Sequence, residues 1–312
     1  MTVTVAPLLE SDLPAATRIF RVAFGTFLGA PDPETFWSDR DYLHGRWHAP
    51  HVAAFGATRD GTLLGTNFAT RWGSVGFFGP ITVRPELQNA GIAQALLIRS
   101  MEQFDAWATT QTGLFTFAQS AKHVGLYSKF GFYPRFLTAI MAHPAADRTQ
   151  HGWSRYSTLS DANRDAALAG CREVADSVYP GLDLTEEIRS AHAQGLGDTM
   201  LIEGPQGIAA FAICHYGPKS EAGADTCFVK FGAVRDTAAA GSDYQRLIDA
   251  CESLSVAAGM GTVLAGTNLA RQEAYEALVA RGYRTVIQGV SMHRNNEPGY
   301  CRPGVYAIDD WR

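Results

Sequence analysis

The feature that most constrains the fold of this chain is an internal repeat at an offset of 151 positions. Several residue pairs recur in register at that offset: Val83-Arg84 as Val234-Arg235, Leu96-Leu97 as Leu247-Ile248, Gly131-Phe132 as Gly282-Tyr283, and Met141 as Met292. A repeat that keeps its register over so long a stretch indicates two copies of one folding unit. The chain of 312 residues is also long enough for two domains.

We therefore expect two homologous domains, one over residues 1–145 and one over residues 154–312. The segment between them, "HPAADRTQHG", is polar and contains a proline and a glycine, which is typical of a linker. A single undivided domain is the alternative. The tail after residue 294 has no counterpart in the first copy, and its aromatic and aliphatic side chains predict that it packs on the body of the protein.

Composition and charge argue against several classes of protein. Apolar residues make up 46% of the chain and charged residues 18%, the balance of a globular protein. The formal net charge of −5, with no basic run, argues against nucleic acid as a partner. The N-terminus "MTVTVAPLLESDLP" has neither a basic segment nor a long apolar one, so we expect no signal peptide, no membrane span and a cytoplasmic location. The five cysteines form no CxxC pair, which predicts free thiols and no zinc site.

The local pattern of the first copy predicts an α/β (α+β) unit with a mixed, mostly antiparallel sheet flanked by helices. Asp60-Gly61 predicts a hairpin over 51–72, and Gly79-Pro80 predicts a break in the strand over 74–83. The other expected elements are a helix capped by Ser11-Asp12, a helix or loop over 37–47, a helix over 93–104, a strand over 113–119, a helix after residue 121 ended by Gly131, and a strand over 135–143.

The second copy repeats this order of elements. Its pattern predicts a hairpin over 199–216, a strand over 225–234, a helix over 243–258, a strand over 261–267, a helix over 271–283 and a strand over 285–294. The repeat in the sequence is therefore also a repeat in the expected secondary structure.

The stretch "VRPELQNAGIA" at residues 83–93 places a polar, glycine-bearing loop between a strand and a helix. Free N–H groups at the start of such a helix bind phosphate, and small residues let the phosphate approach the backbone. Downstream, "LYSKFGFYP" at 126–134 follows the next strand. These stretches resemble the acyl-CoA-binding motif Gln/Arg-x-x-Gly-x-Gly/Ala and a later motif of the GNAT superfamily of N-acyltransferases. The repeat makes the chain similar to tandem GNAT proteins.

The resemblance implies acetyl-CoA as the co-substrate, no metal, and a cofactor site in the first copy. Loop amides would hold the pyrophosphate of CoA: those of Gln88, Asn89, Ala90, Gly91, Ile92 and Ala93. The strand residues Ile81, Thr82 and Val83 would pair with the pantetheine arm, and an amide near Ile81 would polarise the thioester carbonyl. Ser120 stands where many members carry asparagine. Tyr127 would be the general acid for the CoA thiolate, unless its ring only packs in the core.

The chain departs from the family pattern in its general base. The cofactor strand "SVGFFGPITV" has no carboxylate, where many members carry a glutamate. Six residues outside the motifs are candidates for the base: His44, His48, His51, His123, Asp41 and Tyr42. Six aromatic residues either line an acceptor pocket or fill the core: Phe24, Phe27, Phe36, Trp37, Trp47 and Trp72.

The second copy lacks the chemistry of the first. At the same offset its loop carries Ala239, Ser242 and Tyr244, and Leu278 replaces the tyrosine. We expect this copy to keep the fold without the CoA site, in a monomeric pseudo-dimer or a homodimer. A shifted register with Gly241 as the loop glycine is the alternative.

The sequence therefore predicts an N-acetyltransferase that moves an acetyl group from acetyl-CoA to a primary amine of a small molecule, by direct transfer in a ternary complex. Because no acidic or basic stripe marks the chain, a small molecule is favoured over a protein acceptor. Two other hypotheses remain: a non-catalytic acyl-CoA-binding protein, and an acyl-CoA decarboxylase on the same fold.

Overall fold

The computed structural model describes residues 3–147 and 152–312. The first half contains β1 (Thr4–Pro7), α1 (Leu13–Leu28), α2 (His44–Trp47), β2 (Val52–Arg59), β3 (Thr62–Trp72), β4 (Val75–Phe78), β5 (Thr82–Val83), α3 (Ile92–Ala106), β6 (Gln111–Thr116), α4 (Ala121–Ser128) and β7 (Phe132–Pro144). The second half contains β8 (Trp153–Arg155), α5 (Asp161–Val178), α6 (Thr185–Ala193), β9 (Gly197–Gly204), β10 (Gly207–Gly217), β11 (Gly223–Val234), α7 (Ala240–Ala257), β12 (Thr262–Asn268), α8 (Gln272–Ala280), β13 (Arg284–Arg294) and β14 (Ala307–Ile308). Short 3-10 turns lie at Glu10–Asp12, Pro33–Thr35, Pro85–Leu87 and Tyr156–Thr158.

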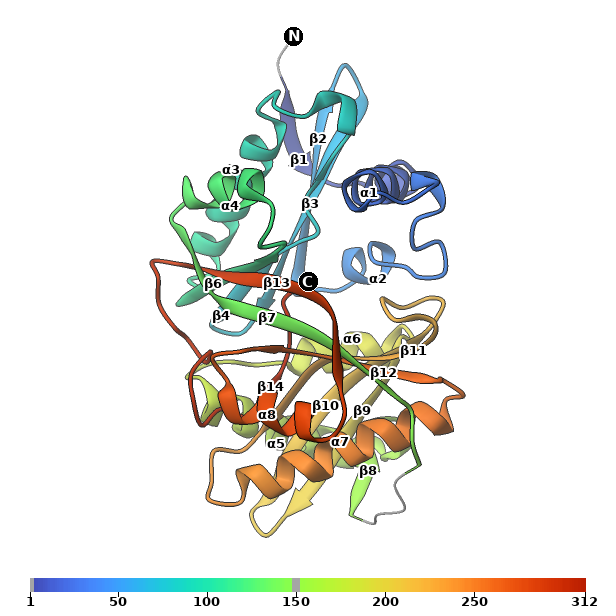
Figure 1. Cartoon of the computed structure of the whole chain (residues 1–312), viewed down its shortest axis with the longest axis vertical. Coiled ribbons are helices and arrows are strands. Elements are labelled where there is room, and N and C mark those ends of the chain that lie inside the picture. The colour runs from blue at the N-terminus through green and yellow to red at the C-terminus, as the bar shows by residue number, and fades with distance from the viewer. Residues whose placement is uncertain (1–2, 148–151) are drawn as a thin grey trace.

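The strands of the described residues form one continuous mixed sheet (Figure 1). Their order is β1-β2-β3-β4-β6-β13-β7-β12-β11-β10-β9-β8, with β5 paired to β3 and β14 paired to β11. Most pairs are antiparallel; the two parallel pairs are β4 with β6 and β11 with β12. The expected α/β architecture with a mixed, mostly antiparallel sheet is confirmed.

The two halves exchange their last strands. Strand β13 of the second half lies between β6 and β7 of the first, pairing Val290 with Thr116 on one side and Arg284 with Ala142 on the other. Strand β7 in turn pairs with β12 of the second half. In Figure 1, the green β7 and the red β13 run side by side across the middle of the molecule. Neither half therefore completes its sheet without a strand from the other.

Helices cover both faces of the first half's sheet because successive side chains of a strand point to opposite faces. Leu63 and Leu64 on β3 show this alternation. Leu63 belongs to the core that contains α1, and Leu64 belongs to the core that contains α3. Buried residues of α3 recur at helical spacing, at Ile92, Leu96 and the positions that follow them. Both helices contact β5 and β3, and β3 lies beside β4.

Three local expectations can be compared with the structure. Asp60 and Gly61 have φ of 50° and 75°, which is the backbone of the tight hairpin turn expected there. Helix α1 begins directly after Asp12, its N-cap, as expected, but the Asp12 side chain makes no capping hydrogen bond to the helix. The expected end of α4 is misplaced. Lys129 is its C-cap, and Gly131, with φ of 81°, lies two residues further on.

The tail after β13 packs on the body as expected. Strand β14 pairs with β11, and Trp311 is buried under the first half, with its ring stacked on Phe77 at 6.3 Å between centroids. A third core contains side chains of both halves, among them Trp72 and Phe231. The five cysteines are buried free thiols. Across residues 3–147 and 152–312, no helix combines the length and apolar character that crossing a membrane requires.

Candidate functional site

Strands β4 and β6 separate at the point where the sequence predicts a break. Their parallel pairing runs from Val75 to Phe77 and stops there. Gly79 has a φ of 144°, and its N–H turns to the carbonyl of Phe68 on β3. The chain then returns to β3 as β5, where Thr82 pairs with Thr66. The edge of β5 that faces β6 thus has no strand partner among the described residues, so an extended ligand can pair with it.

A cavity of about 640 Å³ opens at this separation. Ten of the eleven site residues predicted from sequence line it: Ile81, Thr82, Val83, Gln88, Asn89, Gly91, Ile92, Ala93, Ser120 and Tyr127. Ala90, the eleventh, lies in the same loop but not in the wall. The cavity also reaches aromatic residues of α1 and the end of the tail. It is large enough for the reactive end of a cofactor and a small second substrate.

The loop before α3 exposes backbone donors to this cavity. Gly91 is the N-cap of α3, with φ of 78° and no side-chain cap, so the N–H groups of the first turn have no partner within the helix. Asn89 also has a positive φ, of 67°. Lys122, at the start of α4, donates to the Gln88 side chain at 2.7 Å and lines the cavity as well. A helix N-terminus beside an ammonium group suits a phosphate. The sequence motifs did not point to Lys122.

Tyr127 lies in the wall of the cavity on α4. Its ring is 5% exposed and meets Phe78 edge to face at 5.5 Å between centroids. Burial raises the pKa of Tyr127 well above its ordinary value. The phenol is therefore protonated at neutral pH and can donate its proton.

The structure separates the six candidates for the base. Only His123 and Tyr42 line the cavity. His51 is buried against Glu187 at 2.9 Å, away from the cavity, and His44 pairs with Asp41 at 2.9 Å. Burial, with Lys122 beside it, lowers the pKa of His123, so its ring is neutral at pH 7. His48 is also absent from the cavity wall.

Of the six aromatic candidates for the acceptor pocket, three line the cavity and three do not. Phe24, Phe27 and Trp37 line the cavity, whereas Phe36, Trp47 and Trp72 do not. Trp72 fills the core shared by the two halves. Five aromatic lining residues were not singled out from sequence for the acceptor side: Phe20, Phe78, Phe115, Phe117 and Trp311. Phe20 and Phe24 are one helical turn apart on α1, a spacing that was available as a signal.

Comparison with known families agrees with this geometry. Residues 15–132, which span the separated strands, the loop and α4, match the sequence profile of the acetyltransferase (GNAT) family. That match assigns residues 15–132 to the GNAT acetyltransferase family. A comparison with curated proteins finds no significant match.

Several solved structures cover nearly the whole chain. A protein of Pyrococcus horikoshii provisionally assigned as an acetyltransferase shares 13% identity over 99% of this chain and 95% of its own, with a TM-score of 0.68. A GCN5-related N-acetyltransferase of Sphaerobacter thermophilus shares 14% identity over 95% and 96%, with a TM-score of 0.57. A tandem GNAT protein from the clavulanic acid biosynthesis pathway shares 12% identity over 94% and 98%, with a TM-score of 0.56. At such identities the likeness shows a shared fold, and that fold is the tandem GNAT fold.

The second half of the chain has the same separated strands, but its own tail fills the gap. Parallel pairing of β11 with β12 covers Thr226–Val229 only. Beyond it, Gly232 and Ala233 pair with Ile308 and Ala307 of β14. At the repeat offset these two positions correspond to Ile81 and Thr82, which border the cavity in the first half.

Side chains complete this closure of the second half. Tyr244 is fully buried in α7, and the Tyr306 ring of the tail packs on it at 5.3 Å between centroids. A Cβ on Gly241 would meet the Tyr306 hydroxyl at 3.2 Å. The equivalent edge of the second half is thus covered by the chain itself.

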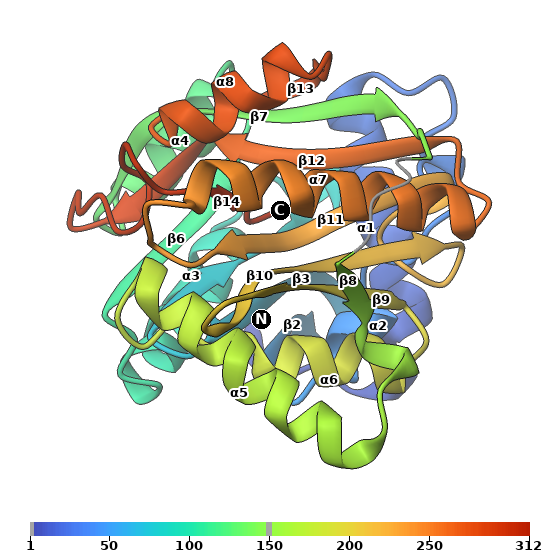
Figure 2. The same cartoon turned by 90° about the horizontal axis from the view of Figure 1, so that it is seen from below.

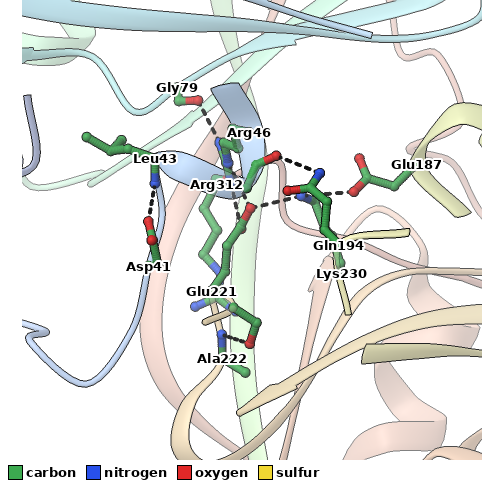
Figure 3. A network of polar contacts seen from close by, with 12 residues as sticks. Asp41, Leu43, Arg46, Gly79, Glu187, Gln194, Glu221, Ala222, Lys230 and Arg312 are labelled. Carbon is green, nitrogen blue, oxygen red and sulfur yellow. Dashed lines mark hydrogen bonds and ion pairs between the residues drawn. The ribbon is translucent and has the colours of Figure 1, made fainter. Parts of the chain in front are cut away.

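A buried ion network connects the second half to the strand break at Gly79 in the first half (Figure 3). Arg46 of α2 donates to the Gly79 carbonyl at 2.6 Å and to both carboxylate oxygens of Glu221 at 2.8 and 2.7 Å. The ammonium group of Lys230 on β11 pairs with the Glu221 carboxylate at 2.8 Å and with the Glu187 carboxylate at 3.1 Å. Burial alone would raise the pKa of Glu221, but Arg46 and Lys230 outweigh it and hold the pKa well below its usual range. The carbonyl at the strand break is therefore tied to the second half.

The far end of the network lies between the halves. Glu187 accepts from His51 at 2.9 Å and from the Trp72 indole at 3.0 Å. Both donors belong to the first half and Glu187 belongs to α6. In the series Arg46, Glu221, Lys230 and Glu187, each charged group lies beside a group of opposite charge. Such pairing offsets the cost of burying the charges.

Proposed function

We propose that this protein is an N-acetyltransferase that moves the acetyl group of acetyl-CoA to a primary amine of a small molecule by direct transfer. The residues 1–145 form the unit that holds acetyl-CoA, and the residues 154–312 form a unit that supports it without a CoA site of its own. One observation carries the proposal. A single cavity brings together the open edge of the cofactor strand, the loop at the N-terminus of α3, and a buried tyrosine.

Each group has a task that its surroundings support. The free N–H groups at the start of α3, with Lys122, bind the pyrophosphate. The open edge at Ile81–Val83 pairs with the amide groups of the pantetheine arm, and the Ile81 N–H polarises the thioester carbonyl. Acetyl-CoA itself supplies the acyl carbon and a thiolate leaving group.

Tyr127 donates the proton that the leaving thiolate needs. Its phenol is neutral at pH 7 because burial raises its pKa. No aspartate or glutamate lines the cavity within the described residues. The amine therefore enters with a free lone pair or passes its proton to a neutral group. His123 is such a group in the wall, since its pKa is lowered by burial.

A kinetic test distinguishes a general acid at Tyr127 from a tyrosine that only supports the fold. Acceptor-dependent release of CoA thiol is measured for the wild type, for Tyr127→Phe and for Tyr133→Phe, a control at a tyrosine that is 51% exposed on β7. We expect Tyr127→Phe to lower kcat about 100-fold or more with little change in KM for acetyl-CoA, and the control to match the wild type.

Two results would count against this assignment. If Tyr127→Phe keeps the full kcat across pH, another group protonates the thiolate. If acetyl-CoA binds but no amine in a broad panel releases CoA, the protein is a binding module, and the catalytic proposal is wrong.

A further inference from the structure

We propose that the acceptor is an aromatic or similarly hydrophobic monoamine that carries no second positive charge. The inference rests on the proposed function and deepens it by naming the substrate class. It follows from the charge and the shape of the part of the cavity that the cofactor motifs do not occupy.

Within the described residues, the side chains that line the cavity include no aspartate and no glutamate. Lys122 and Lys129 contribute positive charge to the lining, whereas the Arg312 guanidinium is paired with Asp310 at 3.1 Å. Lys122 lies beside the phosphate loop, where it faces the cofactor. An amine with several ammonium groups would have to leave water without a counter-charge, which is costly.

Four carboxylates of residues around this wall are already engaged, and Asp310 is one of them, paired with Arg312 at 3.1 Å. Glu221 is held by Arg46 and Lys230. Asp41 accepts from the backbone N–H groups of Leu43 and His44 at 3.0 Å each and pairs with the His44 ring. Asp39 pairs with Arg40. Recruiting one of them for a second ammonium would break an existing ion pair or cap.

Aromatic rings form the wall in place of carboxylates. The rings of Phe20, Phe24, Trp37 and Tyr42, here called the aromatic wall, line one side of the cavity. Trp37 and Tyr42 stack at 5.3 Å with 14° between their planes, and Phe20 packs on both Phe24 and Tyr42. These rings hold each other in place, so the wall is a preformed apolar surface.

A second group of rings faces the cavity from another side. Phe27 lies 5.0 Å from the His123 ring and 5.3 Å from Phe117, all three in the lining. A flat hydrophobic acceptor can insert between such surfaces and bury its own apolar area, while its amine reaches the cofactor strand. A sugar or a polyamine would gain little there, because its polar groups would find few partners.

The test is a comparison of acceptors on the full chain. We measure kcat/KM for 2-phenylethylamine and L-phenylalanine against spermidine and glucosamine, at a fixed concentration of acetyl-CoA. We expect at least one aromatic acceptor to exceed both polar amines by about 100-fold or more. A preference for spermidine or glucosamine would overturn the proposal.

Two variants of α1 test whether the aromatic wall causes the preference for aromatic acceptors. Phe24→Ala removes a ring from the wall, and Leu28→Ala removes a side chain that is 40% exposed and outside the lining. We expect Phe24→Ala to raise KM for the aromatic acceptor about tenfold while the Kd for acetyl-CoA is unchanged, and Leu28→Ala to leave both alone. Equal KM in the two variants would contradict the role of the wall.

Binding experiments keep this proposal distinct from the proposed function. If no amine is turned over, 2-phenylethylamine is titrated into protein saturated with CoA. Absence of binding at millimolar concentration, with acetyl-CoA still bound, would overturn the acceptor class alone. A failure of acetyl-CoA itself to bind would instead overturn the proposed function.

Discussion

Replacing Glu221 by glutamine tests the ion network between the two halves. Glu221 is 5% exposed and accepts three charged hydrogen bonds, two from Arg46 and one from Lys230. Glutamine keeps the size of the side chain and one carbonyl oxygen but removes the charge. Arg46, itself 3% exposed, then loses its counter-charge, whereas Lys230 keeps Glu187 at 3.1 Å. Removing one partner of a buried ion pair costs roughly 3–5 kcal/mol.

We expect Glu221→Gln to lower the free energy of unfolding by about 3 kcal/mol, near the lower end of that range because one hydrogen bond survives. The site should respond too, since the same guanidinium holds the Gly79 carbonyl at the strand break. KM for acetyl-CoA should therefore rise while the protein is still folded. Urea denaturation followed by fluorescence gives the first quantity, and steady-state kinetics gives the second.

An exposed ion pair provides the matched control. Arg18 and Glu34 meet at 2.6 Å with side chains 71% and 57% exposed, so Glu34→Gln should change stability very little. The reasoning would be refuted if Glu221→Gln were as harmless as Glu34→Gln. It would be refuted in part if stability fell but KM for acetyl-CoA stayed the same, because the network would then support the fold and not the cofactor strand.

Two further predictions concern other buried groups. Burial lowers the pKa of His215 to about 4, and that of His293 to about 4 as well. Because the unfolded chain binds protons on both rings below pH 6.5 and the native protein does not, stability should fall as the pH drops from 6.5 to 4, by up to about 3 kcal/mol per ring. Denaturation of His215→Phe over this range should show a smaller slope than the wild type, and an unchanged slope would contradict the burial argument. Trp311→Ala should cost about 3–5 kcal/mol, since the ring packs under Gly113 and bonds the Tyr300 hydroxyl at 2.7 Å. A thermal melt that matches the wild type would show that the tail is not part of the core.

Local signals in the sequence predicted the parts of the fold that depend on neighbouring residues. The hairpin at Asp60-Gly61 and the strand break at Gly79-Pro80 follow from backbone preferences of those residues. The exchange of β7 and β13 was not predicted, because both strands have ordinary apolar patterns that do not name their partners. A strand's pattern shows which face is buried, but its neighbour depends on the whole topology.

The residues of the site also fall into two groups, those that a local motif predicts and those that only long-range packing brings together. The loop before α3 and Tyr127 belong to short motifs that resemble those of the GNAT family, so the resemblance could predict that they lie in one site. The ion pair of Arg46 with Glu221 joins residues 175 positions apart, and nothing local marks them as partners. Trp72 and Trp37 look equally apolar in the sequence, yet one fills the shared core and the other lines the cavity. Long-range packing alone decides between them.

The most direct test of the central claim is a calorimetric titration of acetyl-CoA into the wild type, Gly91→Trp and Gly259→Trp. Gly91 and Gly259 both have a left-handed backbone, with φ of 78° and 73°, and open space beyond the Cα, but only Gly91 lies in the phosphate loop. The account predicts one site per chain, lost in Gly91→Trp and kept in Gly259→Trp. Two sites, or a single site that survives Gly91→Trp, would contradict it and place acetyl-CoA in the second half.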